Sequence, residues 1–251
     1  MTRPIPDIKA NLQAVRERIR RAAAASDRNP DEIRLIAVSK TMSSADIIRA
    51  IDAGQHIFGE STVQDAMTKQ KLMEDPVNEW HFIGHLQTNK VKHIPGNFAW
   101  LHTLDSLKLA RKLSTYAEDR GVVVNVLLQI NIADDPVKFG MKPDSVFTFV
   151  DELLQASLNG VRPRGLMTIG RREGTAADCH RAFSQLRKLR DACATRFGDS
   201  MFRELSMGMS GDFEIAVAEG STMVRVGSAI FGERPEGREH SCRAIDCTNT
   251  E

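Results

Sequence analysis

Short apolar runs alternate with longer amphipathic segments along most of the chain. The short runs are rich in Ile, Val and Leu, a composition typical of strands buried on both faces of a parallel sheet. The segments between them repeat apolar residues every three or four positions, as amphipathic helices do. The predicted strands cover residues 35–40, 56–61, 80–84, 100–105, 122–132, 164–168, 204–207 and 222–227.

Helices are predicted between these strands. Ser43 and Ser106 are suitable N-caps, and Gly54 is a suitable stop. Strand and helix alternate about eight times, which predicts a single (β/α)₈ barrel of the TIM type, preceded by an extra N-terminal helix. The predicted helices cover residues 8–25, 44–53, 63–73, 107–113, 143–154, 183–197 and 213–219.

An open, doubly wound α/β sheet is the competing architecture. No G-x-G-x-x-G run follows the first predicted strand, which argues against its dinucleotide-binding version. The sequence contains no internal repeat and no interdomain linker. We therefore expect one barrel domain over residues 1–232 and a polar C-terminal tail over residues 233–251.

Composition supports a single enzyme-sized domain and excludes several partners. The chain has 251 residues, a net charge of +1 and 41% hydrophobic residues, and (β/α)₈ barrels have about 250 residues. The chain has no excess of basic residues that would indicate a nucleic-acid partner. No apolar segment approaches the ~20 residues that a helix needs to cross a membrane. The N-terminus lacks the apolar core of a signal peptide, and none of the four cysteines forms a C-x-x-C pair. We expect a cytoplasmic monomer with free thiols.

Lys40 is the first candidate for chemistry. It follows the apolar run Leu35–Val38, so its stem lies in the core and its amine at the rim. Partial desolvation lowers the pKa of an amine, and a neutral amine can form a Schiff base with a carbonyl. The alternative is a lysine whose stem is buried while its amine reaches water, which is the commoner case.

A phosphate site is predicted on the same face of the barrel. All strands of a parallel barrel end on one face, and the loops after strands seven and eight often bind phosphate there. Ser210 offers a hydroxyl, and the amides of Gly227 and Ser228 offer donors. Alternatively, Ser210 is an ordinary N-cap and Gly227 a turn residue. A phosphate site opposite a Schiff-base lysine matches pyridoxal 5′-phosphate (PLP), which carries both an aldehyde and a phosphate.

Arg225 ends an otherwise apolar strand, so its buried charge requires a partner. In PLP enzymes an Asp or Arg at the pyridine nitrogen sets the electronics of the ring. An arginine there would keep the nitrogen unprotonated and the ring a weaker electron sink. The alternative is an ion pair with Glu60, Glu204 or Asp212.

Several runs, in order, resemble the pyridoxal phosphate homeostasis protein family: LIAVSKT, HFIGHLQTNK, GLMTIG, LSMGMSGDFEIAV and GSTMVRVGSAIFG. That family is similar to the barrel domain of bacterial alanine racemase. The resemblance implies PLP bound as a Schiff base on Lys40, phosphate contacts from Ser210, Gly227 and Ser228, and Arg225 at the pyridine nitrogen. This chain departs from the family pattern at Ser61, where the family usually has Asn. We expect Ser61 to line the site, in contact through a water.

Two further readings concern other side chains. His81 and His85 are four residues apart, which on a helix would place both on one face. Here His81 is predicted in a strand and His85 in the following loop, and no cluster of other ligands accompanies them, so no metal is predicted. Met167 either packs on the cofactor ring or fills a gap in the core.

Three functions remain open. The resemblance favours a PLP carrier that supplies apoenzymes and has no established catalytic residue. A low-activity PLP-dependent racemase is the second function, and it needs a second base opposite Lys40. In alanine racemase that base is a tyrosine from a further domain, and too few residues follow Gly232 here to form such a domain. The single tyrosine, Tyr116, should point away from the mouth, which leaves His81, His85 or Lys138 as poor relays. A cofactor-free Schiff-base aldolase acting on a sugar phosphate is the third.

Overall fold

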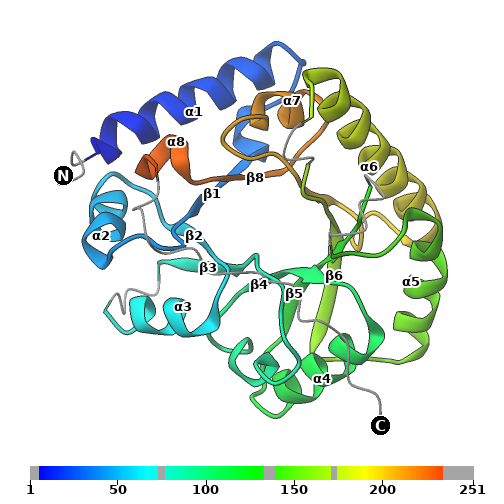
Figure 1. The fold of residues 1–251 in the computed structure, drawn as a ribbon. Coiled ribbons are helices and arrows are strands. Elements are labelled where there is room, and N and C mark those ends of the chain that lie inside the picture. Colours follow the sequence, from blue (N-terminus) through cyan, green and yellow to red (C-terminus); the bar gives the residue numbers. More distant parts are fainter. Residues whose placement is uncertain (1–5, 73–76, 133–138, 171–173, 234–251) are drawn as a thin grey trace, which may run out of the picture.

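Eight parallel strands, joined in chain order, close into a barrel surrounded by helices. We describe it from a computed structural model over residues 6–72, 77–132, 139–170 and 174–233. Figure 1 looks along the barrel axis, with the strands inside and the helices in an outer ring. This confirms the predicted (β/α)₈ barrel. The strands are β1 Arg34–Val38, β2 Ile57–Glu60, β3 Glu79–Phe82, β4 Trp100–Leu104, β5 Val124–Gln129, β6 Val161–Met167, β7 Glu204–Ser206 and β8 Met223–Val226.

Helices α1, α2, α4 and α6 begin at capping side chains. Ser43 and Asp46 form a capping box at the start of α2, and Thr175 and Asp178 form another at the start of α6. The α-helices are α1 Ile8–Ala24, α2 Ser44–Asp52, α3 Val63–Gln70, α4 Leu107–Glu118, α5 Val146–Gln155, α6 Ala176–Phe197, α7 Phe213–Ala218 and α8 Ser228–Phe231; the 3₁₀ turns are η1 Pro30–Glu32, η2 Val91–His93 and η3 Pro143–Ser145.

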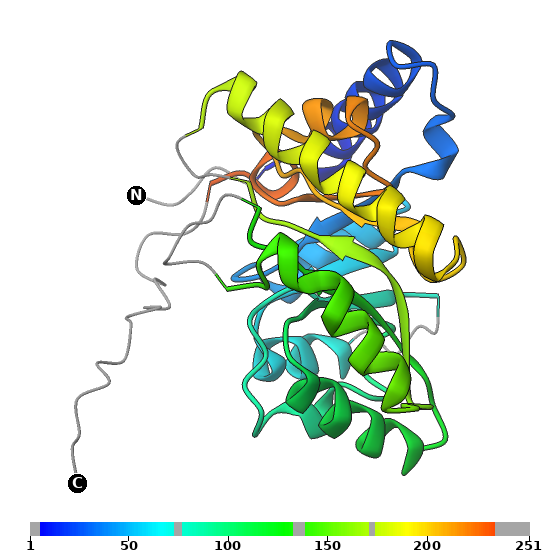
Figure 2. The same cartoon turned by 90° about the vertical axis from the view of Figure 1, so that its right-hand side faces the viewer.

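The extra helix α1 completes the outer ring where the barrel closes. The helix after β8, α8, has only four residues, too few to cover the junction of β8 with β1. Helix α1 packs there against α7, α8 and α2, as Figure 1 shows. Its apolar stripe, Ile8, Leu12, Val15 and Ile19, is buried. Each such side chain contributes roughly 1.5–3 kcal/mol by leaving water. In Figure 2, turned by 90° from Figure 1, α1 (blue) and α6 (yellow) both lie above the strands.

Strand β6 begins earlier than the sequence predicted. Its first residues include Pro163, which cannot donate to a ladder, and two arginines. The structure accommodates them with a register shift opposite Val126 and Leu127, which pair with Pro163 and Gly165. Gly165 has a φ of +155°, and a Cβ there would lie 1.9 Å from the carbonyl oxygen of Glu204. The predicted start at residue 164 was therefore wrong because a bulge carries the strand past the proline.

The inside of the barrel has an apolar layer next to a polar one. The apolar layer consists of Ile36, Trp100, Leu127, Met167 and Met223. Met167 is fully buried in it, which agrees with its reading as a core residue. Successive strand residues alternate between this interior and the helices, so the residues two positions beyond Ile36 and Met223 also face inward.

Candidate functional site

Four adjacent strands, β7, β8, β1 and β2, bring all of the predicted site residues to one end of the barrel. Because the barrel is closed and parallel, the carboxyl ends of these strands are neighbours on one face. Each predicted residue lies in or directly after one of them. They are Lys40 after β1, Ser61 after β2, Ser210 in the loop after β7, Arg225 within β8, and Gly227 and Ser228 after β8.

Lys40 lies next to the turn that follows β8. Strand β1 pairs with β8 up to Ala37 and Val226. Beyond this pair, a Cβ on Gly227 would lie 3.4 Å from the Cβ and the carbonyl oxygen of Val38. Lys40 follows two residues later and is half-buried. Thr41 then adopts a left-handed φ of +67°, a costly conformation for a β-branched residue, which turns the chain sharply after Lys40.

Ser210 and the turn after β8 form a small oxygen-binding site. The backbone N–H of Gly227 donates to Ser210 Oγ at 3.2 Å, and that of Ala229 donates to the same oxygen at 3.3 Å. Two amides converging on one oxygen form the kind of concavity that binds phosphate in other proteins. Ser228, between them, is exposed. The hydroxyl of Ser210 thus belongs to this turn, and it is not the N-cap of α7, whose N-cap is Asp212.

Arg225 is a buried cation held by neutral oxygens. Its Nη1 donates to Ser206 Oγ at 2.5 Å, and its Nη2 donates to the carbonyl oxygen of Thr168 at 2.9 Å. Burial lowers the pKa of Arg225 to about 10, so it remains charged at neutral pH.

The alternative role of Arg225, an ion pair with Glu60 or Glu204, was wrong. Glu60 pairs with Lys69 at 2.7 Å, and Glu204 pairs with Arg34 at 2.8 Å. Asp212 acts on Arg225 only through charge attraction, which opposes part of the burial effect on the pKa.

A buried ionic cluster on α3 fixes the backbone just before Lys40. Lys69 donates to the carbonyl oxygen of Ser39 at 2.8 Å, to Glu60 Oε1 at 2.7 Å and to Asp65 Oδ2 at 2.8 Å. Ser39 Oγ donates to the same Glu60 oxygen at 2.7 Å. Burial raises the pKa of Glu60, although Lys69 and Ser39 both act to lower it. No local pattern in the sequence marks this cluster, because its members come from the end of β1, from β2 and from α3.

Ser61 lies next to the loop after β3. It is half-buried, and its backbone packs so closely on Gly84 that a Cβ there would lie 2.2 Å from the carbonyl oxygen of Ser61. Glycine at 84 is therefore required for the end of β2 and the HFIGHLQTNK loop to meet. The role of Ser61 in lining the site remains a prediction.

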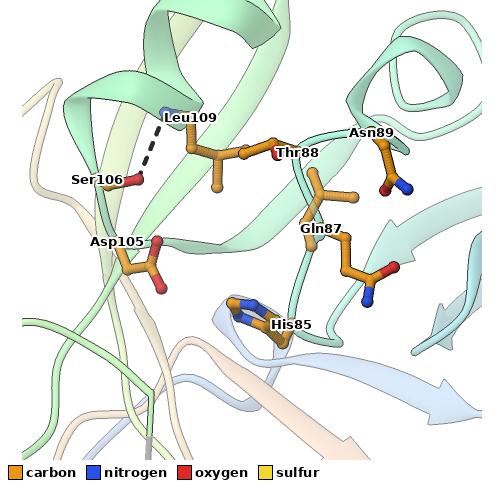
Figure 3. A pocket seen from close by; sticks show the side chains of 8 residues that line it. His85, Gln87, Thr88, Asn89, Asp105, Ser106 and Leu109 are labelled. Atoms are coloured by element: carbon orange, nitrogen blue, oxygen red, sulfur yellow. Dashed lines mark hydrogen bonds between the residues drawn. The ribbon is translucent and has the colours of Figure 1, made fainter. Parts of the chain in front are cut away.

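A pocket of about 490 Å³ opens on the loops after β3 and β4. Figure 3 shows the His85 ring and the Asp105 carboxylate directed into the same space. His85 stacks on Phe139 with ring centroids 3.8 Å apart. Burial raises the pKa of Asp105, and His85 acts to lower it. The pocket is lined by His85, Leu86, Gln87, Thr88, Asn89, Asp105, Ser106 and Leu109, none of which was predicted to bind the cofactor.

Side chains inside the barrel form a hydrogen-bonded chain that was not predicted from the sequence. His81 Nε2 is 2.6 Å from Glu79 Oε1, and His81 Nδ1 is 2.8 Å from His102 Nε2. His102 Nδ1 is in turn 2.9 Å from Ser206 Oγ, the oxygen that accepts from Arg225. The signal was present: His81 and His102 both occupy strand positions, where alternation places every second side chain inside the barrel.

Among the described residues considered as proton relays for a racemase, only His85 lies on the loops beyond the strand ends, in the pocket of Figure 3. Tyr116 lies in the third turn of α4, on the outer ring. His81 is fully buried in the interior, and Lys138 lies outside the described residues. Over the part of the chain that the structure describes, no three His, Cys, Asp or Glu side chains form a metal-binding group, and no helix is long and apolar enough to cross a membrane.

Comparisons with known proteins agree with this architecture. The alanine racemase N-terminal domain family matches residues 10–235. The pyridoxal phosphate homeostasis protein of Escherichia coli is 42% identical over 236 residues, covering 91% of this chain and 97% of that protein. The protein of the same description from Pseudomonas aeruginosa is 40% identical over 230 residues, covering 92% and 97%.

Solved structures of related proteins have the same barrel fold. PipY of Synechococcus elongatus with PLP bound is 36% identical, with a TM-score of 0.79, covering 90% of this chain and 100% of that one. An alanine racemase of Clostridium difficile is 15% identical, with a TM-score of 0.68, covering 92% of this chain and 58% of that one. The second likeness concerns the fold alone.

Proposed function

The chain belongs to the pyridoxal phosphate homeostasis protein family, and from this premise we propose that it binds PLP reversibly and takes part in vitamin B6 homeostasis. One observation carries the proposal. The turn after β8 directs two backbone N–H groups at a single oxygen, and this turn touches the strand that ends just before Lys40. An amine beside a phosphate-binding turn fits a ligand with an aldehyde and a phosphate.

In this proposal each residue has a separate task. Lys40 would bind the ligand through its amine, and the aldehyde of the ligand would supply the electrophilic carbon for a reversible covalent bond. Ser210, Gly227 and Ser228 bind the phosphate through hydroxyl and amide donors. Arg225 donates to the pyridine nitrogen and, lacking an acceptor, leaves it unprotonated.

We propose that the protein acts as a carrier that keeps free PLP low and supplies apoenzymes in the cytoplasm. A Schiff base suits this task because water or another amine can reverse it. Cys179 and Cys193 are both buried free thiols, which supports a reducing compartment.

Addition of PLP to the purified protein tests the proposal. We expect an absorption band of a protonated Schiff base and, after borohydride reduction, a fluorescent pyridoxyl-lysine detectable by mass spectrometry. A sugar-phosphate aldolase would leave a non-fluorescent adduct with its substrate. Protein that stays colourless with excess PLP would contradict the proposal.

Ser210→Ala should weaken PLP binding without unfolding the barrel. The substitution removes an oxygen at the phosphate position, and one lost hydrogen bond to a charged group lowers affinity about tenfold or more. Titration with pyridoxal, which lacks the phosphate, is the matched control and should give the same affinity for both proteins. An equal loss for the two ligands would place the effect of Ser210 elsewhere.

A further inference from the structure

The hydrogen-bonded chain through the barrel interior ends at Arg225, and it can be traced donor by donor. Arg225 carries only donors, so Ser206 Oγ must accept from it. The hydroxyl proton of Ser206 is then free to point to His102 Nδ1, 2.9 Å away. At the other end, Glu79 is hydrogen-bonded to His81, which is the main reason that its pKa is lowered. An ionised carboxylate only accepts, so His81 Nε2 must donate to it.

The middle of the chain has one consistent arrangement when both histidines are neutral. His81 Nε2 carries the proton given to Glu79, so His81 Nδ1 accepts. His102 Nε2 therefore donates to His81 Nδ1, and His102 Nδ1 accepts from Ser206. Every hydrogen bond in this direction is satisfied, with donors running from Arg225 to Glu79. The reverse direction would require a cationic His81 or a protonated Glu79.

The surroundings favour the neutral histidines. Both rings are fully buried, and burial lowers the pKa of each. Three cationic or anionic side chains act on the pair from other strands, namely Arg34 on β1, Glu204 on β7 and Arg225 on β8. Arg34 and Glu204 pair with each other at 2.8 Å. His81 stacks on Trp100 with ring centroids 5.6 Å apart, which fixes its plane.

We propose that His102 and Ser206 are positioning residues for PLP, because they hold the Arg225 guanidinium in the orientation in which it meets the pyridine nitrogen. The inference rests on the proposed function. Arg225 has a single described side-chain acceptor, Ser206, and the bond from the Ser206 hydroxyl to His102 fixes the direction of the lone pairs that accept from Arg225. The chain also links the cation to the carboxylate of Glu79 at the other end of the barrel.

Nitrogen-15 NMR of the ligand-free protein tests the direction of the chain. We expect His102 and His81 to be neutral at pH 7, each with the proton on Nε2 and a bare Nδ1. A proton on His102 Nδ1 would contradict the proposal, because Ser206 could not then donate to it.

Binding of PLP tests the consequence. Ser206→Ala and His102→Phe should each weaken PLP binding about tenfold and shift the absorption of the bound ligand, because Arg225 loses its fixed orientation. His102→Gln keeps one donor and one acceptor and should restore much of the affinity.

The outcomes separate this inference from the proposed function. Ser206→Ala is the decisive variant, because it changes the side-chain volume little and should fold even if His102→Phe does not. If Ser206→Ala binds PLP with unchanged affinity and an unchanged absorption spectrum, the positioning role is wrong while PLP binding stands. If the unaltered protein itself does not bind PLP, the proposed function fails and the positioning role fails with it.

Discussion

Lys40→Ala should abolish the covalent attachment of PLP. Alanine has no amine, so the absorption band disappears and borohydride leaves no pyridoxyl group on the protein. The phosphate-binding turn remains, so PLP should still bind, with an affinity lower by about a hundredfold, or ~2.8 kcal/mol. Absorbance titration and mass spectrometry before and after reduction measure both effects.

Lys108→Ala is the matched control for this substitution. Lys108 lies in the first turn of α4, after β4 on the same face of the barrel, but it is exposed. It should keep the absorption band and the adduct. Retention of a stoichiometric adduct in Lys40→Ala would show that another lysine is the site.

Lys69→Met should cost about 3–5 kcal/mol of stability at neutral pH, because it leaves a buried carboxylate without its cation. Lys69 is 3% exposed and Glu60 is fully buried. For a chain of this size such a loss lowers the melting temperature by about 10 °C. PLP binding should weaken as well, since Lys69 holds the carbonyl oxygen of Ser39 beside Lys40.

The stability loss in Lys69→Met should depend on pH. The pKa of Glu60 is already raised by burial, and removing Lys69 raises it further. A carboxyl with a folded pKa above its unfolded value favours the folded state when protonated, so stability falls as pH rises from the unfolded value toward the folded one. Thermal unfolding should therefore show a larger loss at pH 8 than at pH 5.

Two variants isolate the cause. Lys71→Met changes an exposed lysine at the C-cap of the same helix and should leave stability unchanged. Glu60→Gln combined with Lys69→Met removes the buried charge and should recover much of the lost stability. Equal losses in the single and double variants, at both pH values, would mean that packing and not charge is responsible.

The barrel was predictable because its signals are local and repeated. Short Ile- and Val-rich runs mark the strands, and capping residues such as Ser43 mark the helix starts. The start of β6 was placed too late because a proline normally argues against a strand. In the structure a bulge allows Pro163 to lie within β6. Helix α8 was missed because four residues are too few to show a periodicity.

The site was predictable only in part. Lys40, Ser210 and Gly227 could be placed on one face because the strand ends of a parallel barrel share that face. The partners of Arg225 could not, since Ser206 and Thr168 reach it from strands that are distant in sequence. For the same reason the sequence left open an ion pair of Arg225 with Glu60, Glu204 or Asp212, whereas in the structure Glu60 pairs with Lys69 and Glu204 pairs with Arg34.

A crystal structure of the protein soaked with PLP tests the account most directly. It predicts one molecule bound by both of its ends, with continuous density from Lys40 Nζ to the ring and the phosphate on the amides of Gly227 and Ser228. A PLP molecule joined to a different lysine, or one whose phosphate lies away from that turn, would contradict it.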